Sequence, residues 1–284
     1  MPWFDLPLPD LHAYHTATEE PPGLDQWWRE RLGQARALAS APTVTRYEAD
    51  GYGPAEVYDV EFSGARGDRI RAWYIRPPAS LNGALPVVVK FIGYGGGPEY
   101  SSVMTRGLGN PESYYYTRLF TDAVRAAETA AGLAGRSPVA VTGVSQGGGL
   151  ALATAGLLAD AVAVCHADVP FLCDIQRGVT TAPDMPYTEV AEFLAQQVGY
   201  EATALNTLRY VDCALLARRI TAQCLLSVGL MDTICPPSTV FAAYNEITAP
   251  KDIAVFSFGV HAVPPAHLER QLRHLRTHLP SQPA

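Results

Sequence analysis

The stretch VTGVSQGGG, from Val141 to Gly149, decides how the middle of the chain folds. An apolar run typical of a buried strand leads into it, and a helical pattern that reaches Leu158 comes after it. Residues 143–147 fit G-x-S-x-G, a pattern that has meaning when it joins a strand to a helix. Such a turn is sharp, so its neighbours must be small, and it lifts the serine hydroxyl above the sheet. Ser145 is therefore the candidate nucleophile.

The alternative interpretation of this stretch is an ordinary glycine-rich turn, which could bind a phosphate. The glycines do not fit the spacing G-x-x-x-x-G-K-[ST] of a phosphate-binding loop. They do not give G-x-G-x-x-G either, so a nucleophile is favoured.

Short apolar runs alternate with helical patterns on both sides of Ser145. Strands are expected at 86–93, 137–144, 161–167, 222–230 and 252–259, and helices at 113–131, 147–158, 237–247 and 264–279. Strands that are apolar on both faces indicate a mostly parallel, doubly wound sheet with helices on both faces. The fold class is therefore α/β. In the last helix, Leu268, Leu272, Leu275 and Leu279 form one apolar stripe.

We expect a single domain over residues 1–284. Residues 1–41 predict an N-terminal helical arm, and 170–220 a helical cap insertion. Residues 56–64 and 69–77 are rich in β-formers and predict an antiparallel hairpin. No run resembling a strand lies between Ile92 and Ser137, so one expected strand is missing after Tyr100.

Composition argues against several classes of partner. The net charge of −7 comes from 28 acidic and 21 basic residues without long runs, so we expect neither nucleic acid nor membrane partners. The N-terminus lacks the features of a signal peptide, and no run reaches the roughly 18 apolar residues of a membrane span, which favours a cytoplasmic protein. Five cysteines without C-x-x-C spacing predict reduced, mostly buried thiols and no zinc site.

A serine nucleophile needs a base and a carboxylate that orients the base. In this fold the order is serine, acid, histidine, each just after a strand. Asp232 and His261 meet this condition. Weaker candidates are His166 and Asp168 at a strand end, Asp252 at the wrong end of a strand, His12 and His15 in the arm, and His267, His274 and His278, expected to be solvated on the last helix.

Two backbone amides are also needed to bind the oxyanion. Gln146, which follows the nucleophile, provides the first. The second is expected from GYGGGP after the strand at 86–93, where Tyr94 is the choice and Gly95 remains open. A plain flexible loop is the alternative.

These residues belong to longer strings: FIGYGGG, YYYTRLFTDAVRAAE, GVSQGGG, DVPFLCD and SVGLMDTICPPSTVFAAYN. Through these strings the chain after Val57 resembles the acetyl xylan esterase and cephalosporin C deacetylase family of α/β-hydrolases, which implies an α/β-hydrolase fold. The resemblance implies that Ser145, Asp232 and His261 form the triad, and that the amides of Tyr94 and Gln146 form the oxyanion hole. It also implies acetyl esters of xylo-oligosaccharides or of cephalosporin C type as substrates, and a cytoplasmic homohexamer. No metal or organic cofactor is implied.

The chain departs from the family in two places. The family's further strand, Arg-Gly-Gln motif and long loop are missing after GYGGG, either as a true deletion or because residues are left out of the sequence. The family's His-Glu-Gly-Gly is replaced by residues 261–264, His-Ala-Val-Pro, so the loop that presents the base must differ.

The sequence thus predicts a serine carboxylesterase that removes acetyl or other short acyl groups. The alternatives are another short-acyl serine hydrolase, such as a thioesterase, lactone hydrolase or peptidase, or a catalytically weak scaffold.

Overall fold

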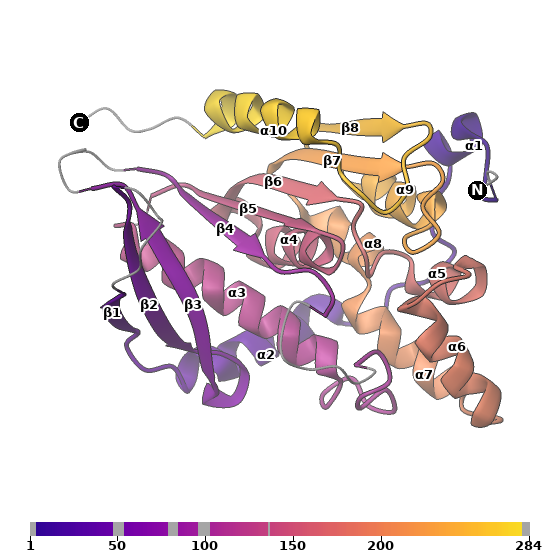
Figure 1. The fold of residues 1–284 in the computed structure, drawn as a ribbon. Helices are drawn as coiled ribbons and strands as arrows, with labels where there is room; N and C mark the ends of the chain where they lie inside the picture. Colours follow the sequence, from indigo (N-terminus) through magenta and orange to yellow (C-terminus); the bar gives the residue numbers. More distant parts are fainter. Residues whose placement is uncertain (1–3, 48–53, 79–84, 96–102, 136, 280–284) are drawn as a thin grey trace.

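The computed structural model describes residues 4–47, 54–78, 85–95, 103–135 and 137–279, and contains two separate sheets (Figure 1). The first sheet is antiparallel, in the order β1 (Thr43–Tyr47), β2 (Glu56–Ser63), β3 (Arg69–Arg76). The second is parallel and keeps the order of the chain: β4 (Val87–Phe91), β5 (Val139–Val144), β6 (Val162–Asp168), β7 (Gln223–Gly229), β8 (Lys251–Phe256). The predicted hairpin and all five predicted strands are confirmed, whereas β1 was not foreseen.

Helices lie around the parallel sheet, as expected. They are α1 (Leu8–His12), α2 (Leu24–Ala37), α3 (Tyr115–Leu133), α4 (Gln146–Leu158), α5 (Ile175–Thr181), α6 (Tyr187–Gln196), α7 (Glu201–Leu208), α8 (Cys213–Leu216), α9 (Pro237–Glu246) and α10 (Pro265–His278). Five parallel strands in chain order require four crossovers in one direction. Because crossovers are right-handed, their helices all fall on one face of the sheet.

That face is the main core. Val139, Val141, Cys165 and Ala167 point into it, and the buried helix α4 packs against β5 and β6 there. Residues of opposite parity, such as Ala140 and Val164, pack against Leu279 of the C-terminal segment, so α10 covers the second face over β6 and β7. Helices therefore cover both faces of the sheet, but α10 is the only helix among the described residues that covers the second face.

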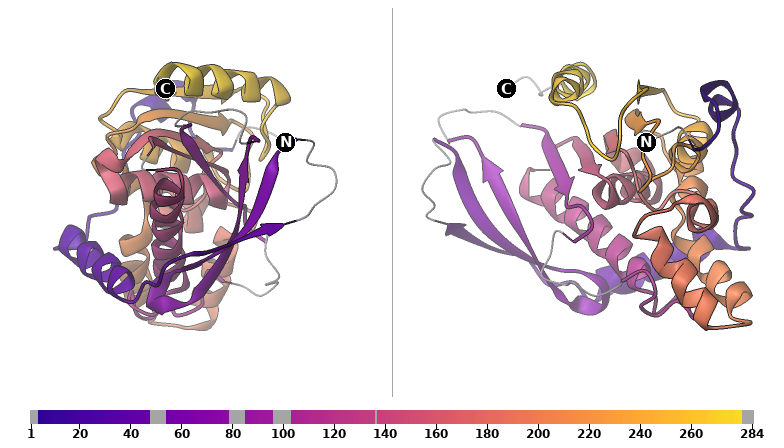
Figure 2. Two further views of the ribbon diagram at one scale, coloured as in Figure 1. Left: turned by 90° about the vertical axis from the view of Figure 1, so that its left-hand side faces the viewer. Right: turned by 45° about the vertical axis from the view of Figure 1, so that its right-hand side comes forward.

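Helices α1 and α2 lie in the segment expected to form an N-terminal arm, and α5 to α8 lie in the segment expected to form a cap. Helix α2 lies beside α3 (Figure 2), where the Trp28 ring stacks on Phe120. Helices α5 to α8 lie within residues 175–216, on the right of Figure 1 where the arrows of the parallel strands point, and on the opposite side of the molecule from β1–β3.

The gap predicted in the sheet corresponds to the break between the two sheets. The position after Tyr100 lies outside the described residues, and the described residues 103–114 form turns without a strand. No pairing joins β3 to β4 in the described part of the chain. Apolar side chains on these strands are exposed, with Trp73 59% and Val88 45% accessible. This is the exposure expected where a central strand is lacking.

Two further features reflect the composition. All five cysteines are buried and unpaired, as predicted. None of the helices in the described ranges has both the length and the apolar character needed to cross a bilayer.

Candidate active site

Ser145 lies at the turn between β5 and α4. Its φ of 58° and ψ of −120° fall in a region that residues with side chains rarely adopt, the strain expected of a nucleophile turn. The backbone around it holds this conformation: the Ser145 N–H donates to the Asp168 carbonyl at 2.9 Å. The Ser145 carbonyl accepts from the N–H groups of Gly149 and Phe171, each at 3.0 Å.

The glycines around Ser145 are required by close backbone packing. A Cβ on Gly143 would lie 2.2 Å from the carbonyl carbon of Gly147, and one on Gly147 would lie 2.5 Å from the Phe91 oxygen. A Cβ on Gly149 would lie 2.3 Å from the Phe171 oxygen. Each contact is with backbone, which cannot move aside as a flexible side chain would. The first turn of α4 therefore packs directly against the loops that follow β4 and β6.

Asp232 and His261, predicted from chain order alone, meet in the structure. Asp232 follows β7 and is fully buried, and its Oδ2 lies 2.8 Å from Nδ1 of His261, which follows β8. Its Oδ1 accepts the N–H groups of Ile234 and Cys235, each at 2.9 Å. These amides fix the carboxylate, and the carboxylate orients the imidazole so that its Nε2 is left to exchange a proton.

The Ser145 hydroxyl lies beside Cys235. Burial raises the pKa of the Cys235 thiol well above its usual value, and a hydrogen bond with Ser145 offsets part of that rise. Ser145 and His261, both among the described residues, share no direct hydrogen bond. Catalytic hydrogen bonds are often long without substrate and shorten when it binds.

The loop after β4 lies against the nucleophile turn. A Cβ on Gly93 would lie 3.7 Å from the Val144 carbonyl, one residue before Ser145. Gly95 has a φ of 71°, which glycine adopts without strain. The residues proposed for the second oxyanion amide, Tyr94 or Gly95, are therefore close to the turn that carries the first.

Both residues of the predicted oxyanion pair are held by their side chains. The Tyr94 hydroxyl donates to Glu189 Oε1 at 2.5 Å, and Glu189 Oε2 accepts the Met104 N–H at 3.3 Å. Burial and this carboxylate raise the pKa of the Tyr94 phenol. The buried Tyr116 hydroxyl donates to Gln146 Oε1 at 3.0 Å. No local pattern indicated these partners, because Glu189 and Tyr116 lie on the distant helices α6 and α3.

The weaker candidates have other partners. His166 Nε2 lies 3.1 Å from His274 Nδ1, and Asp168 bonds to side chains of β7 and α10. Asp252 is the second residue of β8 and pairs with Arg270. His12 packs on Phe241, and His15 pairs with Glu246. The expectation that the histidines of the last helix are solvated is wrong for His267, which is buried, and for His274, which is half-buried against His166.

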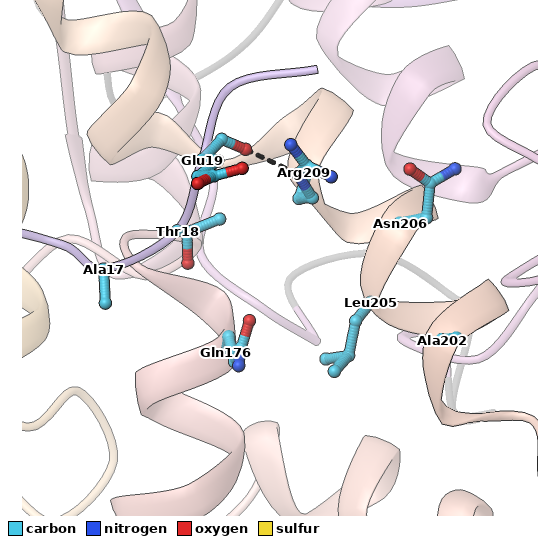
Figure 3. A pocket seen from close by; sticks show the side chains of 8 residues that line it. All are labelled: Ala17, Thr18, Glu19, Gln176, Ala202, Leu205, Asn206 and Arg209. Carbon is cyan, nitrogen blue, oxygen red and sulfur yellow. Dashed lines mark hydrogen bonds between the residues drawn. The ribbon is translucent and has the colours of Figure 1, made fainter.

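A hollow of about 230 Å³ lies apart from these residues (Figure 3). It is formed by the N-terminal arm and the cap, with Thr18 on one side and Gln176, Asn206 and Arg209 on the other. Arg209 donates to the Glu19 carbonyl across it. The hollow contains none of the predicted catalytic residues. Within the described ranges, no group of His, Cys, Asp or Glu side chains is arranged to hold a metal ion.

Known proteins are similar to this chain in sequence and in fold. The acetyl esterase Axe7A of Xylanibacter ruminicola is 33% identical over 162 residues, which are 56% of this chain and only 35% of that enzyme. The acetyl xylan esterase of Paenibacillus sp. R4 superposes with a TM-score of 0.89 at 29% identity, covering 96% of this chain and 100% of that one. Acetyl xylan esterase 1 of Thermoanaerobacterium sp. JW/SL YS485 gives 0.85 at 29% identity, covering 95% and 98%.

The family model for acetyl xylan esterases (AXE1) matches in two segments, residues 1–101 and 95–279. The segments meet at the GYGGGPEYSS region, where the sequence departs from the family pattern. Together they span most of the chain, which therefore belongs to the acetyl xylan esterase family.

Proposed function

We propose that this protein is a serine esterase that removes acetyl and other short acyl groups from small substrates. Ser145 Oγ attacks the ester carbonyl while His261 takes its proton. His261 then gives that proton to the departing alcohol, which leaves an acyl group on Ser145. Water, activated by the same imidazole, releases the acid and restores the serine.

The observation that carries this proposal is the 2.8 Å contact between Asp232 and His261. The buried carboxylate holds Nδ1 as the protonated nitrogen, so Nε2 is the basic one. The strained turn of Ser145 supports the same mechanism, since strain of this kind persists only where surrounding contacts maintain it.

The amides of Gln146 and Tyr94 are proposed to bind the oxyanion. Gln146 begins α4, so its N–H is among those left without a helical partner, at the positive end of the helix dipole. Removal of one oxyanion donor typically costs about 3 kcal/mol of barrier. Loss of either amide should therefore slow the reaction substantially even with the triad intact.

Acetylated xylo-oligosaccharides are the proposed substrates, because the family and the similar solved structures are acetyl xylan esterases. Esters of the cephalosporin C type are a second proposed substrate, on the sequence resemblance alone. On the same ground we propose a cytoplasmic homohexamer. Sedimentation of the purified protein tests the oligomer: a monomer or dimer at micromolar concentration would contradict it.

The mechanism is tested with p-nitrophenyl acetate and the variants Ser145→Ala, His261→Ala and Asp232→Asn. We expect each to lose at least about 1,000-fold in kcat, while His15→Ala in the arm keeps full activity. The wild-type rate should fall under acid conditions, because a protonated His261 cannot accept the serine proton. Full activity in Ser145→Ala would refute the proposal.

Two further measurements separate the alternatives. Rates on p-nitrophenyl acetate, butyrate and octanoate and on an acetanilide give the acyl and bond preference, and faster turnover of octanoate or the anilide would contradict an acetyl esterase. A serine-directed organophosphonate should label Ser145. Folded protein that forms no adduct would instead be a scaffold without catalytic function.

A further inference from the structure

Helix α10 buries its polar side and exposes leucines. His267 is 4% and Gln271 9% accessible, whereas Leu268 and Leu272 are 57% and 43% accessible. The leucine stripe predicted from the sequence therefore contacts the sheet only toward the C-terminal end, at Leu275 and Leu279. Exposed leucines and buried polar groups both cost free energy, so this rotation of the helix needs a specific cause.

The buried polar side of α10 faces Asp168, at the carboxyl end of β6. Its side chain is buried, and Oδ1 accepts the Ser227 hydroxyl at 2.7 Å. Oδ2 accepts the Gln271 amide at 2.7 Å, and His267 Nε2 lies 3.0 Å from Oδ1. A buried carboxylate is costly unless it is paired, and the Ser227 hydroxyl and the Gln271 amide supply its hydrogen bonds. His267 Nε2 is close to this carboxylate but is buried without a hydrogen-bond partner, so α10 turns Gln271 and His267 toward Asp168.

Residue 168 also contacts the nucleophile turn. Its backbone carbonyl accepts the Ser145 N–H at 2.9 Å, and the next N–H, of Val169, donates to the Ser227 carbonyl at 3.0 Å. Ser227 lies on β7, five residues before Asp232. One residue is thus bonded to the turn of the nucleophile, to the strand that leads to the acid and to the helix that follows the base.

The base depends on that helix for its position. His261 lies in the segment between β8, which ends at Phe256, and α10, which begins at Pro265. The first part of this segment is attached to the acid loop, where the Met231 N–H donates to the Gly259 carbonyl at 2.9 Å. The second part leads directly into α10. In the first turn of that helix, His267 lies between Asp168 and Phe256, with the His267 and Phe256 ring centroids 5.8 Å apart.

We propose that Asp168 is a positioning residue for His261: its carboxylate sets the rotation of α10 and thereby the place of the imidazole relative to Ser145. This inference rests on the proposed triad. Asp168 does not touch the substrate; it acts through His267 and the segment 257–264. Its effect should therefore appear in the chemical step and disappear when the imidazole is removed.

The test is a double-mutant cycle of Asp168→Asn with His261→Ala, assayed on p-nitrophenyl acetate. We expect Asp168→Asn alone to lower kcat by about 10- to 100-fold with little change in KM, since a misplacement of about 1 Å can cost 100-fold. In the His261→Ala background the same change should alter the residual rate by less than about 2-fold, because no imidazole remains to be positioned. An equal loss in both backgrounds, or no loss in either, would overturn the inference.

A second pair of variants keeps the test valid if Asp168→Asn fails to fold. His267→Phe fills the site but removes the polar contact with Asp168 and should lower kcat, whereas His267→Gln keeps a polar group there and should restore most of it. Asp252→Asn is the matched control: it breaks the exposed ion pair of Arg270 on the same helix and should leave kcat unchanged. Full activity in His261→Ala would refute the triad itself, whereas an inactive His261→Ala with a fully active His267→Phe would refute only the role of Asp168.

Discussion

Replacement of Tyr94 by phenylalanine removes the hydroxyl that ties the loop after β4 to the cap, yet keeps the backbone amide proposed for the oxyanion hole. The lost bond is the 2.5 Å contact to the buried Glu189 carboxylate. Hydrogen bonds to charged groups contribute about 1.5–3 kcal/mol, so the free energy of unfolding should fall by about 2 kcal/mol. Glu189 retains the Met104 N–H, which limits the loss.

The catalytic effect should be smaller than deletion of an oxyanion donor. Complete loss of a donor lowers kcat by about 100- to 1,000-fold, but here the amide remains and only its placement loosens. We therefore expect Tyr94→Phe to lower kcat on p-nitrophenyl acetate by roughly 10-fold with KM little changed, because the contact that weakens forms in the transition state.

Tyr114→Phe is the matched control. The Tyr114 hydroxyl is also buried and donates at 2.9 Å to the carbonyl of Met104, the same residue whose N–H contacts Glu189. Its removal should cost about 1 kcal/mol of unfolding free energy and leave kcat unchanged. Urea unfolding and steady-state kinetics of both variants complete the comparison. If Tyr94→Phe loses stability but no kcat, or if both variants lose the same kcat, the tether does not serve the oxyanion loop.

Three other outcomes are expected. Gly149→Ala puts a Cβ 2.3 Å from the Phe171 oxygen and should lower both soluble yield and activity, and a variant with normal stability would contradict the packing argument. Burial lowers the pKa of His166 to about 4, so the unfolded chain binds the extra proton and stability falls as pH drops from about 6.5 toward 4, by up to about 3 kcal/mol. In urea unfolding, the free energy of unfolding should fall less between pH 7 and pH 4.5 in His166→Gln than in the wild type. Leu268→Gln should change the unfolding free energy by less than about 0.5 kcal/mol, whereas Leu279→Ala should cost about 2–4 kcal/mol; the reverse order would mean that α10 packs Leu268 against the sheet.

The parallel strands and most helices could be predicted because their patterns are local. Apolar runs such as 137–144 are long enough to indicate buried strands, and α3 and α9 follow the helical period closely. β1 was missed because all five of its residues are exposed, so no apolar alternation marks it. Its pairing with β2 comes from tertiary structure, which a short polar run does not reveal.

The contact between Asp232 and His261 could be anticipated from order along the chain, because the carboxyl ends of parallel strands meet at one edge. The contacts that hold the loops of the site in place could not be predicted in this way. Glu189 is separated from Tyr94 by 95 residues, and its side chain resembles that of any helical glutamate in the sequence. The rotation of α10 escaped prediction for the same reason: the leucines follow the helical period, but a carboxylate about 100 residues away decides which side packs.

The strand order explains why the base and the cover of the second face belong to one segment. Strands β4 to β8 succeed one another without reversal, so every crossover helix lies on the face of α4. The side of the sheet that carries Asp168 and Ser227 must then be covered by the helix after β8, and the connection to that helix contains His261. The proposed role of Asp168 therefore predicts that substitutions that weaken the second face also shift the imidazole of His261.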